Sequence, residues 1–244
     1  MENNFSQRTV AEIVRNDYRT ADVFKKYGIN YCCGGQVALE EACLFKQLNS
    51  LDIIHELEQA CRTVKLSNNL QYDQWKLDFL IDFIINVHHA YLYKAIPSLE
   101  LRLTSFMEGH KKKYPELIQI HELFLELSNV LLAHNRYEEE IIFPYIKQID
   151  TAYRGKEPYG YLFVRTLRKP LSNVEKEHSV ISDLLGKLKL CTNNYVFPDN
   201  ACTNHQVLYH KLRELNDDFV QHTHLEHNIL FPKAIEIEQQ LLRL

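Results

Sequence analysis

HNRYEEEIIFP, at His134–Pro144, recurs in closely similar form as HTHLEHNILFP at His222–Pro232. Both copies fit the pattern H-x-x-x-E-x-x-I-[IL]-F-P. Residues four positions apart lie on the same face of an α-helix, so each copy presents an imidazole and a carboxylate side by side. Apolar residues share this face in both copies, which indicates that it points inward. The pattern therefore predicts two helices that each bring a histidine and a glutamate into a protein core.

Apolar residues recur at helical spacing through four long segments of the chain. These segments cover about Tyr72–Glu108, Pro115–Ile149, Pro170–Leu190 and Ala201–Leu242. Only 7 Gly and 7 Pro among 244 residues leave little turn chemistry for a many-stranded protein. Four long amphipathic helices joined by modest loops predict an all-α fold built on an antiparallel four-helix bundle.

Residues 1–66 read as a separate small helical domain. Its expected helical segments are TVAEIVRNDY, RTADVFKKYG and SLDIIHELEQACR, and the turn GINYCCGG separates the second from the third. The polar stretch KLSNNLQYD, which follows them, reads as a linker. We therefore expect a small N-terminal domain over residues 1–66 and the bundle over residues 72–244.

Composition and charge exclude several functional classes. A formal net charge of −4 gives no electrostatic case for binding nucleic acid or an anionic membrane. The first residues, MENNFSQRTV, lack the features of a signal peptide, and no apolar run approaches the roughly 18 residues of a membrane helix. We expect a soluble, cytoplasmic protein whose six cysteines are thiols rather than a disulfide framework.

The other two long segments offer histidines at matching depth. His178 lies on the apolar stripe of the third segment, and the first segment carries the pair His88–His89 in NVHHAYLY. If His89 is taken, the histidines at 89, 134, 178 and 222 are spaced by 45, 44 and 44 residues, which places one histidine per helix near one level. Periodicity does not separate His88 from His89, because Ile84 and Ile85 support either face.

Four imidazoles and two carboxylates in one core predict two metal ions. A buried carboxylate without a cation is costly, and two that lie close together cost more. Two six-coordinate ions that share both glutamates keep one or two positions open for an exogenous ligand. A thiolate-free set of imidazoles and carboxylates favours iron, then manganese, over structural zinc. We expect two iron ions joined by an oxygen bridge.

The remaining features of the two repeated stretches read as structural. Pro144 and Pro232 are expected to kink their helices beyond the glutamate. His227, next to the second glutamate, lies off the ligand stripe and reads as a solvated or locally bonded side chain.

These motifs together resemble a known family. TVAEIV, YGINYCCGG, IINVHHAY, the two HxxxE segments and KEHSVISDLL are similar to the di-iron proteins for repair of iron centres (YtfE, ScdA and DnrN). Proteins of that family carry a hemerythrin-like bundle behind a short N-terminal domain. The resemblance covers nearly the whole chain, and its most specific part is CCGG together with the pattern of four histidines and two glutamates. It implies that the metal ligands are His89, His134, Glu138, His178, His222 and Glu226.

The resemblance also implies a function. It implies the repair of iron–sulfur clusters damaged by nitric oxide or oxidants, in the cytoplasm, by a protein that is often a dimer and lends iron from a labile di-iron site. Damaged iron–sulfur proteins would be its partners, and nitric oxide or O2 its small ligands. Two alternatives stay open: a di-iron enzyme that reduces nitric oxide or peroxide, and a hemerythrin-like carrier or sensor of diatomic gases. The bridging glutamates favour repair and the reducing enzyme over a gas carrier, and the attached cysteine domain favours repair.

Cys32 and Cys33 are the candidate reactive groups of the N-terminal domain. They precede Gly34 and Gly35 and the expected helix QVALEEACLF. Thiols beside a helix N-terminus are more acidic and more reactive than ordinary thiols. This placement predicts a redox or metal-relay role, and the alternative is that both cysteines are merely small residues in a tight turn.

Overall fold

The computed structural model describes residues 5–32, 35–62, 70–155 and 171–243. Within these ranges the regular secondary structure is helical apart from one isolated β-bridge between Thr9 and Ala38, so the expected all-α fold is confirmed. The chain divides into two compact units, Met1–Asn68 with Tyr195–Leu212 and Asn69–Asn194 with Arg213–Leu244. This division assigns an additional piece to the first unit, and the two-domain boundary expected from the sequence stays a prediction.

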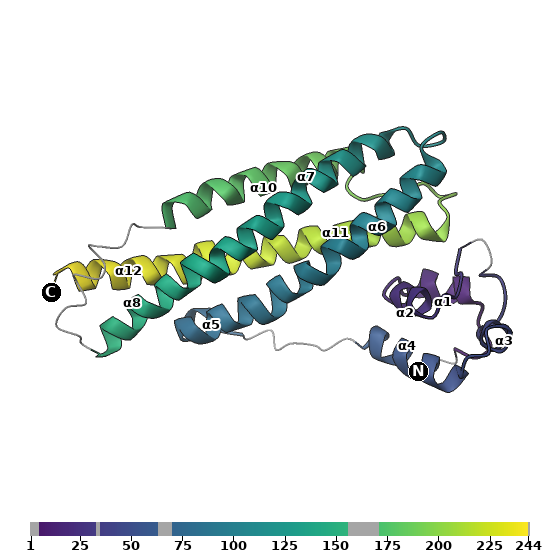
Figure 1. The fold of residues 1–244 in the computed structure, drawn as a ribbon, viewed down its shortest axis with the longest axis horizontal. Helices are drawn as coiled ribbons and strands as arrows, with labels where there is room; N and C mark the ends of the chain where they lie inside the picture. Colours follow the sequence, from purple (N-terminus) through teal and green to yellow (C-terminus); the bar gives the residue numbers. More distant parts are fainter. Residues whose placement is uncertain (1–4, 33–34, 63–69, 156–170, 244) are drawn as a thin grey trace. The chain divides into compact units, whose positions relative to one another are not determined.

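Four long helical segments form the bundle expected from the sequence (Figure 1). They are α5 (Leu77–Phe83) with η2 (Ile84–His89) and α6 (Ala90–His110); α7 (Glu116–Tyr137) with η3 (Glu138–Ile142) and α8 (Phe143–Gly155); α10 (Leu171–Cys191); and α11 (Thr203–Leu225) with η4 (Glu226–Leu230) and α12 (Phe231–Arg243). Helix α7 packs against α6 and α10, and α8 packs against α5 and α12. A short turn joins α6 to α7, so these neighbours run antiparallel.

Buried apolar side chains hold these segments together. Each fully buried Leu or Ile contributes about 1.5–3 kcal/mol relative to an exposed one. The core at the end of the bundle formed by α5, α8 and α12 includes Leu80, Ile81, Ile84, Ile146, Ile149, Leu230 and Ala234.

None of the described helices combines the length and the apolar character that a membrane crossing requires.

Three of the four long segments are interrupted by a π-helical turn, η2, η3 or η4. In η3 the N–H of Phe143 donates to the carbonyl of Glu138, five residues earlier, and Pro144 follows with no N–H to donate. The turn η4 repeats this arrangement ahead of Pro232. The prolines therefore mark widened turns at the glutamates, a detail that the expectation of a simple kink did not include.

In its described residues, the first unit contains four short helices and the start of α11 around its own core. The helices are α1 (Val10–Asn16), α2 (Thr20–Lys26), α3 (Leu39–Phe45) and α4 (Ser50–Cys61). Their buried side chains form one cluster, to which the later piece of the unit contributes Val207. The fully buried members include Val10, Phe24, Leu39, Ile53 and Leu57.

The segment that follows the two cysteines is fixed to the start of α1. The side chain of Thr9 caps this helix. The N–H groups of Val10 and Ala11 donate to the carbonyls of Val37 and Gly35, at 3.1 and 2.8 Å. The first N–H groups of a helix have no partner inside it, so these carbonyls complete the hydrogen bonding of the first turn.

Candidate metal centre

The structure brings together all six side chains that the sequence predicts as metal ligands. Each is at most 2% exposed, and they come from all four long segments of the bundle. Their convergence is observed, and their binding of metal stays a prediction. The side chains are His89, His134, Glu138, His178, His222 and Glu226.

These side chains form two overlapping groups of four. The first consists of His89 and His222 with both glutamates, and the second of His134 and His178 with the same glutamates. Within each group one ligand atom per residue lies within 4.8 Å of the others. Elsewhere in the described ranges, no cluster of His, Cys, Asp and Glu has this geometry. Two sets that share both carboxylates fit a dinuclear metal centre.

All four imidazoles direct the same nitrogen, Nε2, toward the glutamates. The Nε2 atoms of His89 and His222 are 3.2 Å apart, and those of His134 and His178 are 2.8 Å apart. Glu138 Oε2 lies 3.3 Å from His134 Nε2 and 3.4 Å from His89 Nε2. One carboxylate thus reaches a histidine of each group, as a bridging ligand must.

The carboxylate oxygens themselves indicate that a cation fits here. Both oxygens of Glu138 and Oε2 of Glu226 are buried without a hydrogen-bond partner in the described part of the chain. Buried polar atoms nearly always have a partner, because leaving one unsatisfied is costly. A pair of divalent cations between the two glutamates supplies what these oxygens lack, and the imidazole and carboxylate donors suit iron or manganese.

The two glutamates differ in the direction of their pKa shifts. Burial alone raises the pKa of Glu138, but the attraction of the nearby imidazoles of His134, His222 and His89 outweighs it and holds that pKa well below its ordinary value. Burial also raises the pKa of Glu226, and repulsion from Glu138 raises it further. The pKa values of the two glutamates are therefore shifted in opposite directions.

Two of the histidines are shifted in opposite directions. Burial and repulsion from His134 lower the pKa of His178 to about 3, so its ring is neutral and ready to bind a cation. Burial also opposes protonation of His222, but the charges of Glu226 and Glu138 outweigh it and raise the pKa of His222 to about 10. A cation must therefore displace a proton from His222 when it binds.

Three of the four histidines have a polar partner at their outer nitrogen, Nδ1. Such partners fix the orientation of a ligand ring and raise its basicity. No sequence pattern signals these partners, because each contact crosses between helices, and His227 reads from the sequence only as a solvated or locally bonded side chain. The contacts are His89 with Glu139 Oε1 at 2.7 Å, His134 with Glu177 Oε2 at 3.0 Å, and His178 with His227 Nε2 at 2.5 Å.

His88 is buried as well as His89. The widened turn η2 contains both, which leaves His88 only 1% exposed. His88 belongs to neither group of candidate ligands, and its Nδ1 lies 2.9 Å from Asp218 Oδ1 instead. The geometry therefore groups His89, and not His88, with the glutamates.

The candidate cysteines lie in the other unit. Cys33 and Gly34 fall outside the described residues. Cys32 is partly exposed, and its N–H donates to Asn30 Oδ1 at 3.0 Å. A redox or metal-relay role for these cysteines stays a prediction.

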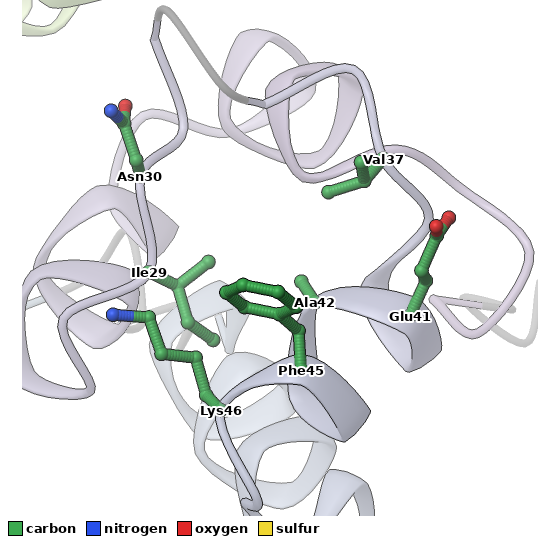
Figure 2. A pocket seen from close by; sticks show the side chains of 7 residues that line it. All are labelled: Ile29, Asn30, Val37, Glu41, Ala42, Phe45 and Lys46. Atoms are coloured by element: carbon green, nitrogen blue, oxygen red, sulfur yellow. The ribbon is translucent and has the colours of Figure 1, made fainter.

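A pocket of about 330 Å³ lies in the same unit as the cysteines. Figure 2 shows the ring of Phe45 beside Ile29 and Ala42, with Glu41 and Lys46 on different sides of the opening. Asn30, whose side chain accepts the hydrogen bond from Cys32, also lines the pocket, together with Val37. None of the described residues that line it is a predicted site residue.

Comparisons with known proteins cover the same two regions. Residues 80–234 match the hemerythrin HHE cation binding domain, and residues 6–61 match ScdA_N, a domain of unknown function (DUF542). The iron-sulfur cluster repair protein YtfE of Enterobacter sp. (strain 638) is 32% identical over 234 residues, which cover 95% of this chain and 98% of that protein. The protein of the same name from Escherichia coli O81 (strain ED1a) is similar to the same extent.

Proposed function

Because the chain belongs to the family of YtfE-like iron–sulfur cluster repair proteins, in which an ScdA_N domain precedes a hemerythrin HHE domain, we propose that it repairs iron–sulfur clusters damaged by oxidative or nitrosative stress. It does so by lending iron from a labile di-iron site. Its partners are damaged iron–sulfur proteins, and nitric oxide or O2 are its small ligands. We further propose that it acts in the cytoplasm and as a homodimer.

In this proposal the six converging side chains hold two iron ions. His89 and His222 bind one ion, His134 and His178 bind the other, and an oxygen bridge joins them. Glu138 and Glu226 bridge the two ions. The observation that carries the proposal is the sharing of both glutamates by two groups of four ligands, with three carboxylate oxygens otherwise unsatisfied. A bound di-iron pair supplies releasable iron and open coordination positions for a small molecule.

The residues around the centre control how the ions are held. Glu139 and Glu177 accept from the outer nitrogens of His89 and His134, which keeps the inner nitrogens directed at the ions. The proton on His222 competes with the cation, so the site binds less tightly than fully deprotonated ligands would. Both effects suit a store that is specific but can give up its iron.

A second candidate function is the reduction of nitric oxide or peroxide. Each group provides two imidazoles and two shared carboxylates, which leaves room on a six-coordinate ion for a small molecule. Such an enzyme keeps its iron through many turnovers, whereas a repair protein loses iron to its client. We favour repair, because relatives that match nearly the full chain carry that name.

The deciding experiment follows iron and client activity together. The iron-loaded full chain is incubated with an iron–sulfur enzyme inactivated by nitric oxide, and both the client's activity and the iron left on the chain are measured. We expect client activity to return as iron leaves the chain, and no return with metal-free protein. Continued consumption of nitric oxide without loss of iron and without client recovery would instead support the second candidate.

A further inference from the structure

His222 differs from the other three candidate ligand histidines at its outer nitrogen. Its Nδ1 is buried and has no hydrogen-bond partner in the described part of the chain. The equivalent nitrogens of His89, His134 and His178 contact Glu139, Glu177 and His227. A ligand histidine usually depends on such a partner to fix its ring, so something else must orient His222.

The ring of His88 lies against the ring of His222. Their centroids are 5.7 Å apart and their planes differ by 9°. The ring of Phe83 packs edge-on against His88, with the two ring centroids 5.7 Å apart. Because the rings of His88 and His222 are nearly parallel and both are buried, the ring of His88 limits how far the plane of His222 can tilt toward it.

Asp218 holds His88 in this place. Its Oδ1 lies 2.9 Å from His88 Nδ1, across from α11 to η2. Asp218 also precedes His222 by four residues in α11, so both lie on one face of that helix. The hydrogen bond therefore ties the ring that stacks on His222 to the helix that carries His222.

We propose that His88 and Asp218 are positioning residues that orient His222 for metal binding, in place of the hydrogen bond that the other ligands have. Neither residue belongs to a group of candidate ligands. The proposal rests on the proposed di-iron function. It predicts that His88 and Asp218 affect the ion bound by His89 and His222 before the ion bound by His134 and His178.

The test compares variants of the full chain that separate the stacked ring from the hydrogen bond. His88→Ala removes both, His88→Phe keeps a stacking ring, and Asp218→Ala releases the ring from its anchor. Asp217→Ala, an exposed neighbour of the same charge, is the matched control. Circular dichroism checks that each variant folds. If His88→Ala does not fold, His88→Phe remains as a test of the lost hydrogen bond, because it keeps the volume of the ring.

Two measurements distinguish positioning from general stability. The first is the rate at which a chelator removes each of the two iron ions, together with the absorption spectrum of the loaded protein. We expect His88→Ala to release one ion about tenfold faster and to change the spectrum, at the lower end of the effect of removing an outer partner. Asp218→Ala and His88→Phe, which both keep a stacking ring but lose the hydrogen bond between the two residues, follow it in part, and Asp217→Ala resembles wild type. The second is the imidazole NMR signal of His222 in metal-free protein, which should shift in His88→Ala but not in Asp217→Ala.

The possible results separate this inference from the function on which it rests. Wild-type chain that binds no iron would contradict the proposed function. Wild-type chain with two ions, beside His88→Ala with unchanged release, spectrum and NMR signal, would overturn the positioning role alone. Equal acceleration of both ions in His88→Ala would also overturn it, because only one group contains His222.

Discussion

Glu138 and Glu226 occupy equivalent places in two helices: each is the first residue of a five-residue π-helical turn that a Phe-Pro pair follows. Each also lies four residues after a histidine of the candidate centre. The sequence repeat therefore encodes a backbone shape as well as two ligands. π-Helical turns are rare and occur often at functional sites, where they alter the direction of the side chains that follow.

Replacing either glutamate by glutamine tests whether the carboxylates bridge two ions. Glu138→Gln and Glu226→Gln remove one negative charge each with little change in volume. We expect either variant to hold fewer than the two ions per chain of the wild type, because both groups lose a charged ligand. Metal analysis of the purified protein measures this. Two ions per chain with an unchanged absorption spectrum in both variants would show that the assignment is wrong.

The proline after each widened turn can be tested separately from the ligands. Pro144→Ala restores an N–H group that can donate to the carbonyl of Glu140, which allows η3 to close into an ordinary α-helical turn. We expect the side chain of Glu138 to turn away from its partners and metal content to fall. Pro97→Ala is the control, because Pro97 is an exposed proline inside α6 and adjoins no π-helical turn. Full metal content in Pro144→Ala would mean that packing alone maintains the turn.

Metal uptake should release protons, and its affinity should rise with pH. The pKa of His222 is raised to about 10, so the metal-free site carries this proton at neutral pH and a cation must displace it. Raising the pH removes the competing proton, which strengthens binding between about pH 6 and pH 9. Calorimetry in buffers of different ionisation enthalpy counts the released protons. An affinity that does not change across this range, with no proton release, would contradict the expected state of His222.

Gly35 should be essential to the segment that carries the cysteines. A Cβ at this position would lie 2.4 Å from the carbonyl oxygen of Tyr31, closer than any tolerated contact. We expect Gly35→Ala to destabilise the chain by about 1–3 kcal/mol, as overpacking does. Gly186→Ala is the control: nothing lies within 4 Å of its added Cβ, and alanine favours a helix by about 0.5–1 kcal/mol over glycine. Urea unfolding measures both, and equal stability of the two variants would contradict the close approach.

The cysteines can be tested without disturbing the candidate metal centre. In the double variant Cys32→Ser and Cys33→Ser we expect wild-type iron content, because every candidate ligand lies in the other unit. Its restoration of a nitric-oxide-damaged iron–sulfur enzyme should nevertheless fall if these thiols relay metal or electrons as predicted. The repair activities of the double variant and of the wild type are compared at equal iron loading. Undiminished repair would assign the whole function to the bundle.

The helical bundle and five of the six converging side chains could be predicted from periodicity and spacing, and His89 was expected from the family resemblance. The choice between His88 and His89 could not, since a period of 3.6 assumes a regular α-helix and η2 is a π-helical turn that buries both. The outer partners Glu139 and Glu177 were missed for another reason. Their contacts depend on the register between helices, which no single segment of sequence records.

The grouping of Tyr195–Leu212 with the first 68 residues was also beyond reach of the sequence. It depends on contacts such as that of Val207 with the core of the first unit, between residues far apart in the chain. Local pattern divides a chain into consecutive pieces, whereas tertiary contacts need not respect that order.

The carbonyls of Gly35 and Val37 complete the hydrogen bonding at the start of α1. The segment behind the cysteines therefore cannot move away without exposing the amides of Val10 and Ala11 to water. Deuterium uptake at these two amides thus reports how often that segment opens. A client protein that binds this segment would therefore slow deuterium exchange at Val10 and Ala11 of α1 without contacting that helix.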